Sequence, residues 1–404
     1  MSKTSLTSRK YVVPFILITT LFFLWGFARA MLDVLNKHFQ DTLNISITQS
    51  SLIQVSSYLA YFMMAIPAGI FINRYGYRKG VVFGLLLFAV GSFLFIPGAQ
   101  VEAFSLYLGA LFIIACGLTF LETAANPYST LLGPKETATS RLNLSQSFNG
   151  LGSALGPFIM GGYLFSQAGA NPSLPYAVMG IVVAIVAIIF SKVNLPEIQT
   201  EEGPTNAETP KHPLKTLMNN RMFLFGLSAL LSYEVSEISI NSYFVNFVTG
   251  MGWMEADVAS YVLGLSLFIF MGGRFIGSWI MRSVKAERML YWCATGSIIS
   301  ILMVILTSIS EQNETSWTRY LPIAFLMTNY LFEAIMFPTI FALTVQGLGN
   351  LTKSAASILM MTPVGGCGFL LMALVADYTT LIIPFAIPLL GFVVVWTYAR
   401  RKCA

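Results

Sequence analysis

The stretch LTFLETAANPYSTLLGPKETATSRLNLSQSFNGLGS, from Leu118 to Ser153, joins the end of a long apolar segment to a second segment that opens polar and becomes rich in glycine. Apolar residues run from Phe104 to Cys116, so Glu122 lies deep in a run long enough to cross a bilayer. A carboxylate inside a membrane segment is costly unless a partner, a water-filled cavity or a proton compensates its charge. Glu122 is therefore a candidate functional residue.

Polar residues extend this pattern on both sides of the turn. Asn126 lies four residues after Glu122 and shares its helical face, and Pro127 removes a backbone donor and loosens the helix. After the turn, a stripe of uncharged donors and acceptors recurs every three residues, at Asn143, Gln146 and Asn149. Two neighbouring helices thus offer an acid and several amides to one interior volume. The alternative is that the amides only join helices by hydrogen bonds, with glycine allowing close packing.

The composition indicates an integral membrane protein. A mean hydropathy of +0.72, with 56% hydrophobic and 10% charged residues, excludes a soluble globular protein. A membrane helix needs ~20 residues, and the 404-residue chain contains twelve apolar segments of that length. We expect all-α spans near residues 11–36, 51–73, 79–98, 104–131, 141–167, 174–192, 221–249, 257–281, 288–309, 318–346, 354–376 and 379–399.

Catalysis and cofactor binding have little support in the sequence. The four cysteines are scattered singly and form neither a metal-binding nor a disulfide pattern. Two histidines are present, without an HExxH, GxSxG or clustered metal-ligand motif. We therefore expect no metal, no cofactor and no enzyme activity, and a membrane-embedded enzyme is the distant alternative.

Lysine and arginine orient the predicted spans. With the amino terminus in the cytoplasm, almost all of them fall at the inward ends and loops, and Lys37 and Arg319 lie outside. Twelve spans return the carboxyl terminus to the cytoplasm. We expect a multi-pass protein of the cell (inner) membrane, embedded in the lipid bilayer, with both termini cytoplasmic and no nucleic-acid partner. Arg274, near the cytoplasmic end of its span, is expected to snorkel.

A polar stretch rich in Pro, Glu and Thr divides the chain at residues 193–217. It predicts a cytoplasmic linker with little fixed structure between a six-helix half at 1–192 and another at 218–404. An internal repeat supports the division: Glu122 and Pro127 in LETAANP match Glu333 and Pro338 in FEAIMFP at one common offset. Two parallel six-span repeats are typical of the major facilitator fold, whose substrate site lies near the bilayer midplane.

Several stretches resemble the fucose–proton symporter family of bacterial sugar transporters, within the major facilitator superfamily. They are FFLWGFARAMLDVL at 22–35, FLETAANPYSTLLGP at 120–134, RLNLSQSFNGLGSALGP at 141–157, MFPTIF at 336–341 and TPVGGCG at 362–368. The resemblance covers nearly the whole chain outside the linker. It implies alternating-access uptake of a hexose, deoxyhexose or amino sugar by cation symport, with the proton favoured, in a monomer. A sodium-coupled or uncoupled sugar carrier is the alternative.

The resemblance also implies roles for individual residues. An Asp on the first helix and a Glu on the fourth serve substrate binding and proton coupling in the family, and these positions are Asp33 and Glu122 here. Gln146 and Asn149 match sugar-contacting positions on the fifth helix. On the seventh helix, Glu237 matches a Gln or Glu position, and Glu is typical of the glucose/galactose-like branch.

The residue types favour the same function. Acids within the predicted spans outnumber arginines, with Asp33, Glu122, Glu234, Glu237 and Glu333 against Arg29 and Arg274. This excess of negative charge is costly unless protons or sodium ions share the site. Sugars need directional hydrogen bonds and apolar faces for their rings. The candidates for these contacts are the amides Asn126, Gln146, Asn149 and Asn241 and the aromatic residues Trp25, Tyr58, Tyr61 and Tyr233.

Three positions depart from the family pattern: Arg29, Glu234 and Glu333. Arg29 lies four residues before Asp33 and can pair with it. A paired Asp33 would be a poor proton carrier, which would shift coupling to Glu122 or Glu237. Alternatively, Arg29 and Asp33 form a structural pair. The two glutamates are interpreted as gate contacts or as residues that face a wet cavity.

Overall fold

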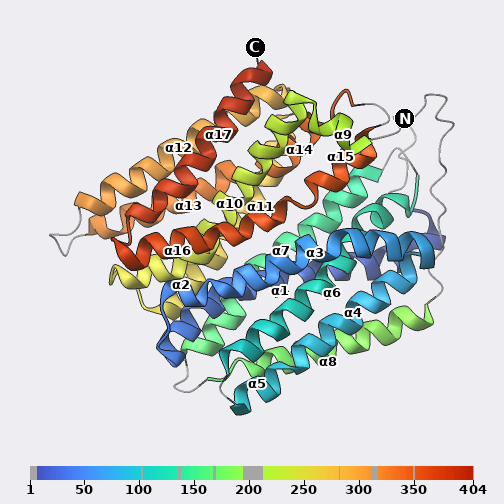
Figure 1. Cartoon of the computed structure of the whole chain (residues 1–404), viewed down its shortest axis with the longest axis horizontal. Helices are drawn as coiled ribbons and strands as arrows, with labels where there is room; N and C mark the ends of the chain where they lie inside the picture. The colour runs from blue at the N-terminus through green and yellow to red at the C-terminus, as the bar shows by residue number, and fades with distance from the viewer. Residues whose placement is uncertain are drawn as a thin grey trace. The chain divides into compact units, whose positions relative to one another are not determined.

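The computed structural model describes residues 7–101, 103–134, 138–166, 170–193, 213–281, 283–310, 317–348 and 351–403. These residues form helices joined by turns, and no β-strand occurs among them (Figure 1). The chain divides into two compact units. The first comprises Met1–His38 with Leu52–Thr200, and the second comprises Phe39–Ser51 with Glu201–Ala404.

The first unit is built from long helices that match the first six predicted spans. They are α1 (Val12–Leu43), α3 (Leu52–Tyr75), α4 (Tyr77–Phe93) with α5 (Phe95–Val101), α6 (Phe104–Leu131), α7 (Ala138–Ser166) and α8 (Ser173–Lys192). Helix α6 packs against both α3 and α4, and α4 also packs against α8. A Cβ atom on Gly117 of α6 would lie 2.5 Å from the carbonyl oxygen of Gly84 on α4, so these backbones meet without side chains between them.

Helices α1 and α7 approach each other through glycines as well. A Cβ atom on Gly26 would clash with the carbonyl oxygen of Asn149, and one on Gly152 would clash with that of Phe23. Small residues at a crossing allow membrane helices to pack backbone to backbone. The polar face of α1 is thereby held beside the amide stripe of α7.

The second unit contains the helical segments of the remaining spans. They are α2 (Ile47–Ser50), α9 (Pro213–Met218), α10 (Arg221–Gly250), α11 (Ala256–Ile280), α12 (Ala286–Ser310), η4 (Trp317–Tyr320), α13 (Leu321–Glu333), α14 (Met336–Val345), α15 (Thr352–Leu359), η6 (Thr362–Gly368), α16 (Phe369–Tyr378), η7 (Ile383–Phe385) and α17 (Ala386–Cys403). Helix α10 packs against α11, α14, α16, α17 and η6. It begins where the Asn220 side chain accepts hydrogen bonds from the backbone of Met222 and Phe223.

All twelve predicted spans correspond to helical segments, and eleven of those in the described residues are long and apolar enough to cross a membrane. Helix α7 matches the remaining span, has 29 residues and carries the polar stripe in its first half. The largest difference lies in α1, which continues to Leu43 rather than ending near 36. Residues 37–43 contain neither Gly nor Pro, and the helix stops before Asn44, whose φ of 52° is a common way to end a helix.

The predicted linker is helical at its end. Residues 194–212 lie outside the described part of the chain, but α9 covers Pro213–Met218. The expectation of little fixed structure was therefore wrong for residues 213–217, because a proline at the first helical position and the buried side chain of Leu217 fix this turn. The division into halves at 1–192 and 218–404 stays a prediction.

Candidate functional site

Helix α1 presents its three predicted site residues on one face of the first unit. Trp25, Arg29 and Asp33 are four residues apart from one to the next, so they lie along a single stripe. Trp25 and Asp33 are buried, and Arg29 is half-buried.

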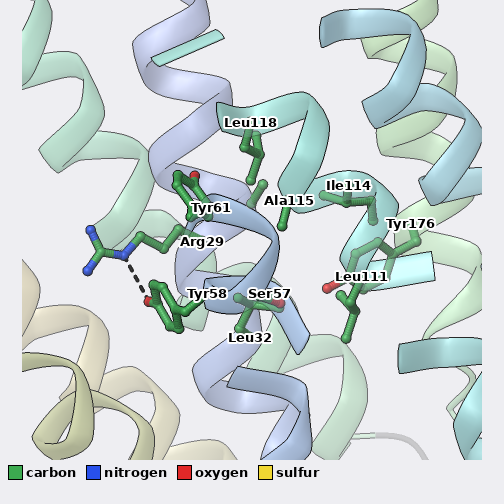
Figure 2. A pocket seen from close by; sticks show the side chains of 11 residues that line it. Arg29, Leu32, Ser57, Tyr58, Tyr61, Leu111, Ile114, Ala115, Leu118 and Tyr176 are labelled. Carbon is green, nitrogen blue, oxygen red and sulfur yellow. Dashed lines mark hydrogen bonds between the residues drawn. The ribbon is translucent and has the colours of Figure 1, made fainter. Parts of the chain in front are cut away.

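Arg29 forms a charged and aromatic cluster with Tyr58 and Tyr61 of α3 and Glu122 of α6, and Figure 2 shows its bond to Tyr58. Its Nε donates a hydrogen bond of 3.1 Å to the Tyr58 hydroxyl of α3, and its Cζ lies 5.7 Å from the centroid of the Tyr58 ring. The Tyr61 ring lies one turn along α3, 6.2 Å from the Tyr58 ring. Glu122 of α6 interacts electrostatically with both Arg29 and Tyr61. The contacts with Tyr58 and Glu122 are additional to the predicted Arg29–Asp33 pair, which stays a prediction.

A small cavity lies beside this cluster (Figure 2). Its lining includes Arg29, Ser57 and Tyr58 together with apolar residues of α6 and Tyr176 of α8. Its volume of about 10 Å³ is room for roughly one water molecule. A sugar is far larger than this volume, so the cavity is not a sugar site in this conformation.

The amide stripe forms hydrogen bonds between helices. The Gln146 Nε2 of α7 donates to the Asn126 Oδ1 of α6 at 3.1 Å, and the Asn149 Nδ2 donates to the Phe22 carbonyl of α1 at 3.2 Å. The interpretation as hydrogen bonds between helices therefore has direct support. A carboxamide carries both donors and an acceptor, so one such bond leaves it able to bind a second group. The side chain of Asn143 lies outside the described residues.

In the second unit, α10 carries the predicted polar residues on successive turns. The Asn241 Nδ2 donates to Glu237 Oε1 at 3.2 Å, and the Tyr233 hydroxyl donates to the backbone carbonyl of Glu333 at 3.2 Å. Glu234 is buried, and a Cβ atom on Gly365 of η6 would lie 2.8 Å from its Cβ. Gly365 in the stretch TPVGGCG thus lets η6 pack against the acidic face of α10.

A break in the tenth span lies next to this face. Helix α13 ends at Glu333 and α14 begins at Met336, two residues before Pro338. Because proline has no N–H, the Ala334 carbonyl four residues earlier loses its helical donor. The Arg274 Nε of α11 donates to this carbonyl at 3.3 Å, and the Arg274 Cζ lies 4.7 Å from the Phe270 ring centroid. The expectation that Arg274 snorkels stays a prediction, and the bond of its Nε to a buried acceptor at the break is a contact that the sequence reasoning did not foresee.

Asn329 is a functional candidate that the sequence reasoning missed. Its Nδ2 donates to Glu333 Oε2 at 2.8 Å, and both side chains are 0% exposed. The signal was present in the sequence, because Asn329 lies four residues before Glu333 and therefore on the same helical face. Within the described residues, no group of three His, Cys, Asp or Glu side chains has the geometry of a metal site.

Comparison with known proteins gives a consistent result. Residues 18–371 match the model of the Major Facilitator Superfamily. The chain is 34% identical over 398 residues to the glucose/galactose transporter of Brucella abortus biovar 1, which covers 94% of this chain and 92% of that protein. It is 33% identical over 429 residues to the L-fucose-proton symporter of Haemophilus influenzae, with 97% of each chain covered. The crystal structure of the transporter FucP in the outward conformation has a TM-score of 0.69 and 30% identity, and covers 98% of this chain and 99% of that one.

Proposed function

Because the chain belongs to the major facilitator superfamily, in the group that contains these sugar transporters, we propose that it takes up a sugar by proton symport. The all-α fold of twelve membrane helices in two halves agrees with the prediction, and the relatives are transporters, not enzymes. The proposed substrate is a hexose, deoxyhexose or amino sugar. Sodium-coupled and uncoupled sugar transport are the alternatives that the experiment below separates.

The observation that carries this proposal is the charge arrangement around Arg29. The Glu122 carboxylate and the Arg29 guanidinium interact inside a membrane-spanning unit, next to the hydroxyls of Tyr58 and Tyr61. Without a bound proton, the two charges offset each other. A proton on Glu122 removes the negative charge, so Arg29 then needs another acid, such as Asp33, as its partner. Proton binding at Glu122 thereby changes the contacts of the residues proposed to hold the sugar.

The proposed sugar contacts combine aromatic faces with amide and acid groups. In the first unit, the polar contacts are Asp33, Glu122, Asn126, Gln146 and Asn149, and the aromatic contacts are Trp25, Tyr58 and Tyr61. In the second unit, they are Tyr233, Glu237 and Asn241. Aromatic rings can cover the apolar face of a sugar ring, while carboxylates and amides satisfy its hydroxyls in fixed directions.

We propose an inner-membrane monomer with both termini in the cytoplasm. The orientation rests on the distribution of lysine and arginine along the chain. Contact with lipid is supported by large apolar side chains that lie exposed along one face of α8, among them Leu174, Val178, Ile181, Ile185 and Ile188. Such a row of exposed apolar residues on a helix indicates contact with a membrane or with another protein.

The test is uptake by the purified protein in sealed vesicles. A panel of labelled sugars is offered with an inward proton gradient, an inward sodium gradient or no gradient. We expect one or a few sugars to accumulate above the outside concentration only with the proton gradient, and a protonophore to abolish this accumulation. Accumulation driven by sodium, or equilibration without accumulation, would support the two alternatives. Absence of transport for every sugar would overturn the proposed function.

A further inference from the structure

The hydrogen bonds of Glu333 and Asn329 leave two buried oxygens without a donor. The Asn329 Nδ2 donates to Glu333 Oε2, which satisfies one carboxyl oxygen. The other carboxyl oxygen, Glu333 Oε1, and the amide oxygen, Asn329 Oδ1, have no hydrogen-bond partner among the described residues. Both side chains are 0% exposed. A buried acceptor without a donor is costly, and the cost is greater when the group is charged.

One proton on Glu333 gives this pair the hydrogen-bond donor that it lacks. A carboxylic acid carries an O–H donor, whereas a carboxylate only accepts. With a proton on Oε1, Glu333 is neutral and can donate from the oxygen that is otherwise unsatisfied, while Oε2 still accepts from Asn329. An acid and a primary amide then have complementary donors and acceptors on both sides.

We propose that Glu333, held by Asn329 at the break between α13 and α14, is a second proton-binding site of this transporter, separate from Glu122. The site lies wholly within the second unit. Its role in coupling rests on the proposed function, but proton binding at Glu333 does not.

The surrounding charges favour a neutral Glu333. Two helices place charged or titratable groups near it: Tyr233, Glu234 and Glu237 on α10, and Arg274 on α11. Helix α12 meets α13 where Gly296 faces the ring of Phe332. If Glu333 and Glu237 were both ionised, their negative charges would repel each other, and Glu333 would carry its charge with no exposed surface. Protonation of the acid with no exposed surface relieves this repulsion at the least cost in solvation.

The same contacts disfavour a metal cation at this position. A hard cation needs several oxygen ligands at once. The carbonyls of Glu333 and Ala334 at the break accept hydrogen bonds from Tyr233 and Arg274, and the positive charge of the Arg274 guanidinium repels a metal cation there. A proton needs only the carboxyl oxygen.

Release of the proton would act on the break itself. The O–H bond of the Glu333 carboxyl breaks, the proton passes to water as hydronium, and a buried carboxylate remains beside Glu237. This anion repels Glu237 and lies next to Ala334, whose carbonyl accepts from the Arg274 guanidinium. The proton on Glu333 thus stabilises the described arrangement of α13, α14 and α11, and its loss favours a rearrangement of the break.

The test is infrared spectroscopy of the full-length protein in lipid, with spectra compared between wild type and variants and between ordinary water and deuterium oxide. A protonated carboxylic acid has a carbonyl stretch that is distinct from the bands of a carboxylate. We expect a band in wild type at neutral pH that shifts on exchange into deuterium oxide. Glu333→Gln should remove this band, and Glu122→Gln should retain it. Asn329→Leu, which removes the donor to Oε2, should shift the band to higher frequency, which a merely structural role of Asn329 would not do.

Three results would overturn the proposal. The first is a band that persists unchanged in Glu333→Gln, and the second is a spectrum without a protonated-acid band. The third is sodium-dependent thermal stabilisation of wild type that Glu333→Gln abolishes, because Glu333 would then belong to a sodium site. If Glu333→Gln does not fold, the frequency shift of the protonated-acid band in Asn329→Leu tests the proposal instead. The spectrum needs no sugar, so the proposed transport function can fail in vesicles while this proton site is still found.

Discussion

The fourth and tenth spans contain the same glutamate–proline motif but differ in helix geometry around it. Each has a glutamate followed five residues later by a proline. Helix α6 continues unbroken through Pro127, and its half-buried Glu122 interacts with an arginine on another helix. The tenth span breaks before Pro338, and its Glu333 is 0% exposed and bonded to an asparagine of its own helix.

The side chains around each proline explain the difference. At the break, Arg274 and Tyr233 donate to the carbonyls of Ala334 and Glu333, so the backbone groups that leave the helical pattern keep partners. In α6, Asn126 instead bonds Gln146 of the neighbouring helix α7, which ties the region after Glu122 to another element. The same motif therefore occurs in one continuous helix and in one broken helix, and the partners that neighbouring helices supply differ between the two.

The largest effect is expected from neutralising Glu122. Glu122→Gln should abolish accumulation against a gradient while leaving exchange of sugar across the membrane partly intact, since a neutral amide mimics the protonated acid at every pH. Glu333→Gln should lower the ratio of protons to sugars but retain some accumulation. The measurement is uphill uptake and counterflow in vesicles for both variants. Full pH-sensitive accumulation by Glu122→Gln would contradict its coupling role.

The second prediction tests the helix break. Arg274→Leu leaves the Ala334 carbonyl buried without its donor and should lower the free energy of unfolding by about 1–3 kcal/mol. Arg288→Leu, at an exposed arginine, is the matched control and should have little effect. Pro338→Ala restores an N–H that can bond this carbonyl, so Arg274→Leu should cost less in the Pro338→Ala background. Equal costs in both backgrounds would show that Arg274 does not stabilise the break through this carbonyl.

These two spans also show which structural features the sequence predicts and which it does not. The hydrophobic segments, the repeat and the buried glutamates were visible because apolar length and misplaced charge are local signals. The Arg29–Tyr58 bond was not visible, because it joins two helices and the i,i+4 rule reaches only residues on one helix, such as Asp33. The bond of Arg274 to the Ala334 carbonyl was not visible for a related reason. Its acceptor is available because a proline on a distant span leaves a carbonyl without its helical donor. The sequence of a single helix does not predict which residues of another helix lie beside it.

The third prediction concerns the amides of α7. Gln146→Ala and Asn149→Ala should each weaken sugar binding by about 1–3 kcal/mol if a buried sugar hydroxyl loses its partner. Asn149→Ala should also lower stability by about 0.6 kcal/mol, an average value for one hydrogen bond between membrane helices, because it removes the donor to the Phe22 carbonyl. Sugar affinity by calorimetry and thermal unfolding separate the two effects. Unchanged affinity with lowered stability would leave the amides a purely structural role.

The smallest effect is expected at the hydroxyl of Tyr58. Tyr58→Phe keeps the ring beside Arg29 and Tyr61 and removes only the acceptor of the Arg29 Nε, so it should lower stability by about 0.5–1.5 kcal/mol. Arg29→Gln should cost more, because Glu122 also loses the charge with which it interacts. A double-mutant cycle between the two changes should give a coupling energy close to the cost of Tyr58→Phe alone. Strict additivity would show that the Arg29–Tyr58 bond does not contribute, and Arg29 would then act mainly through the acids of α1 and α6.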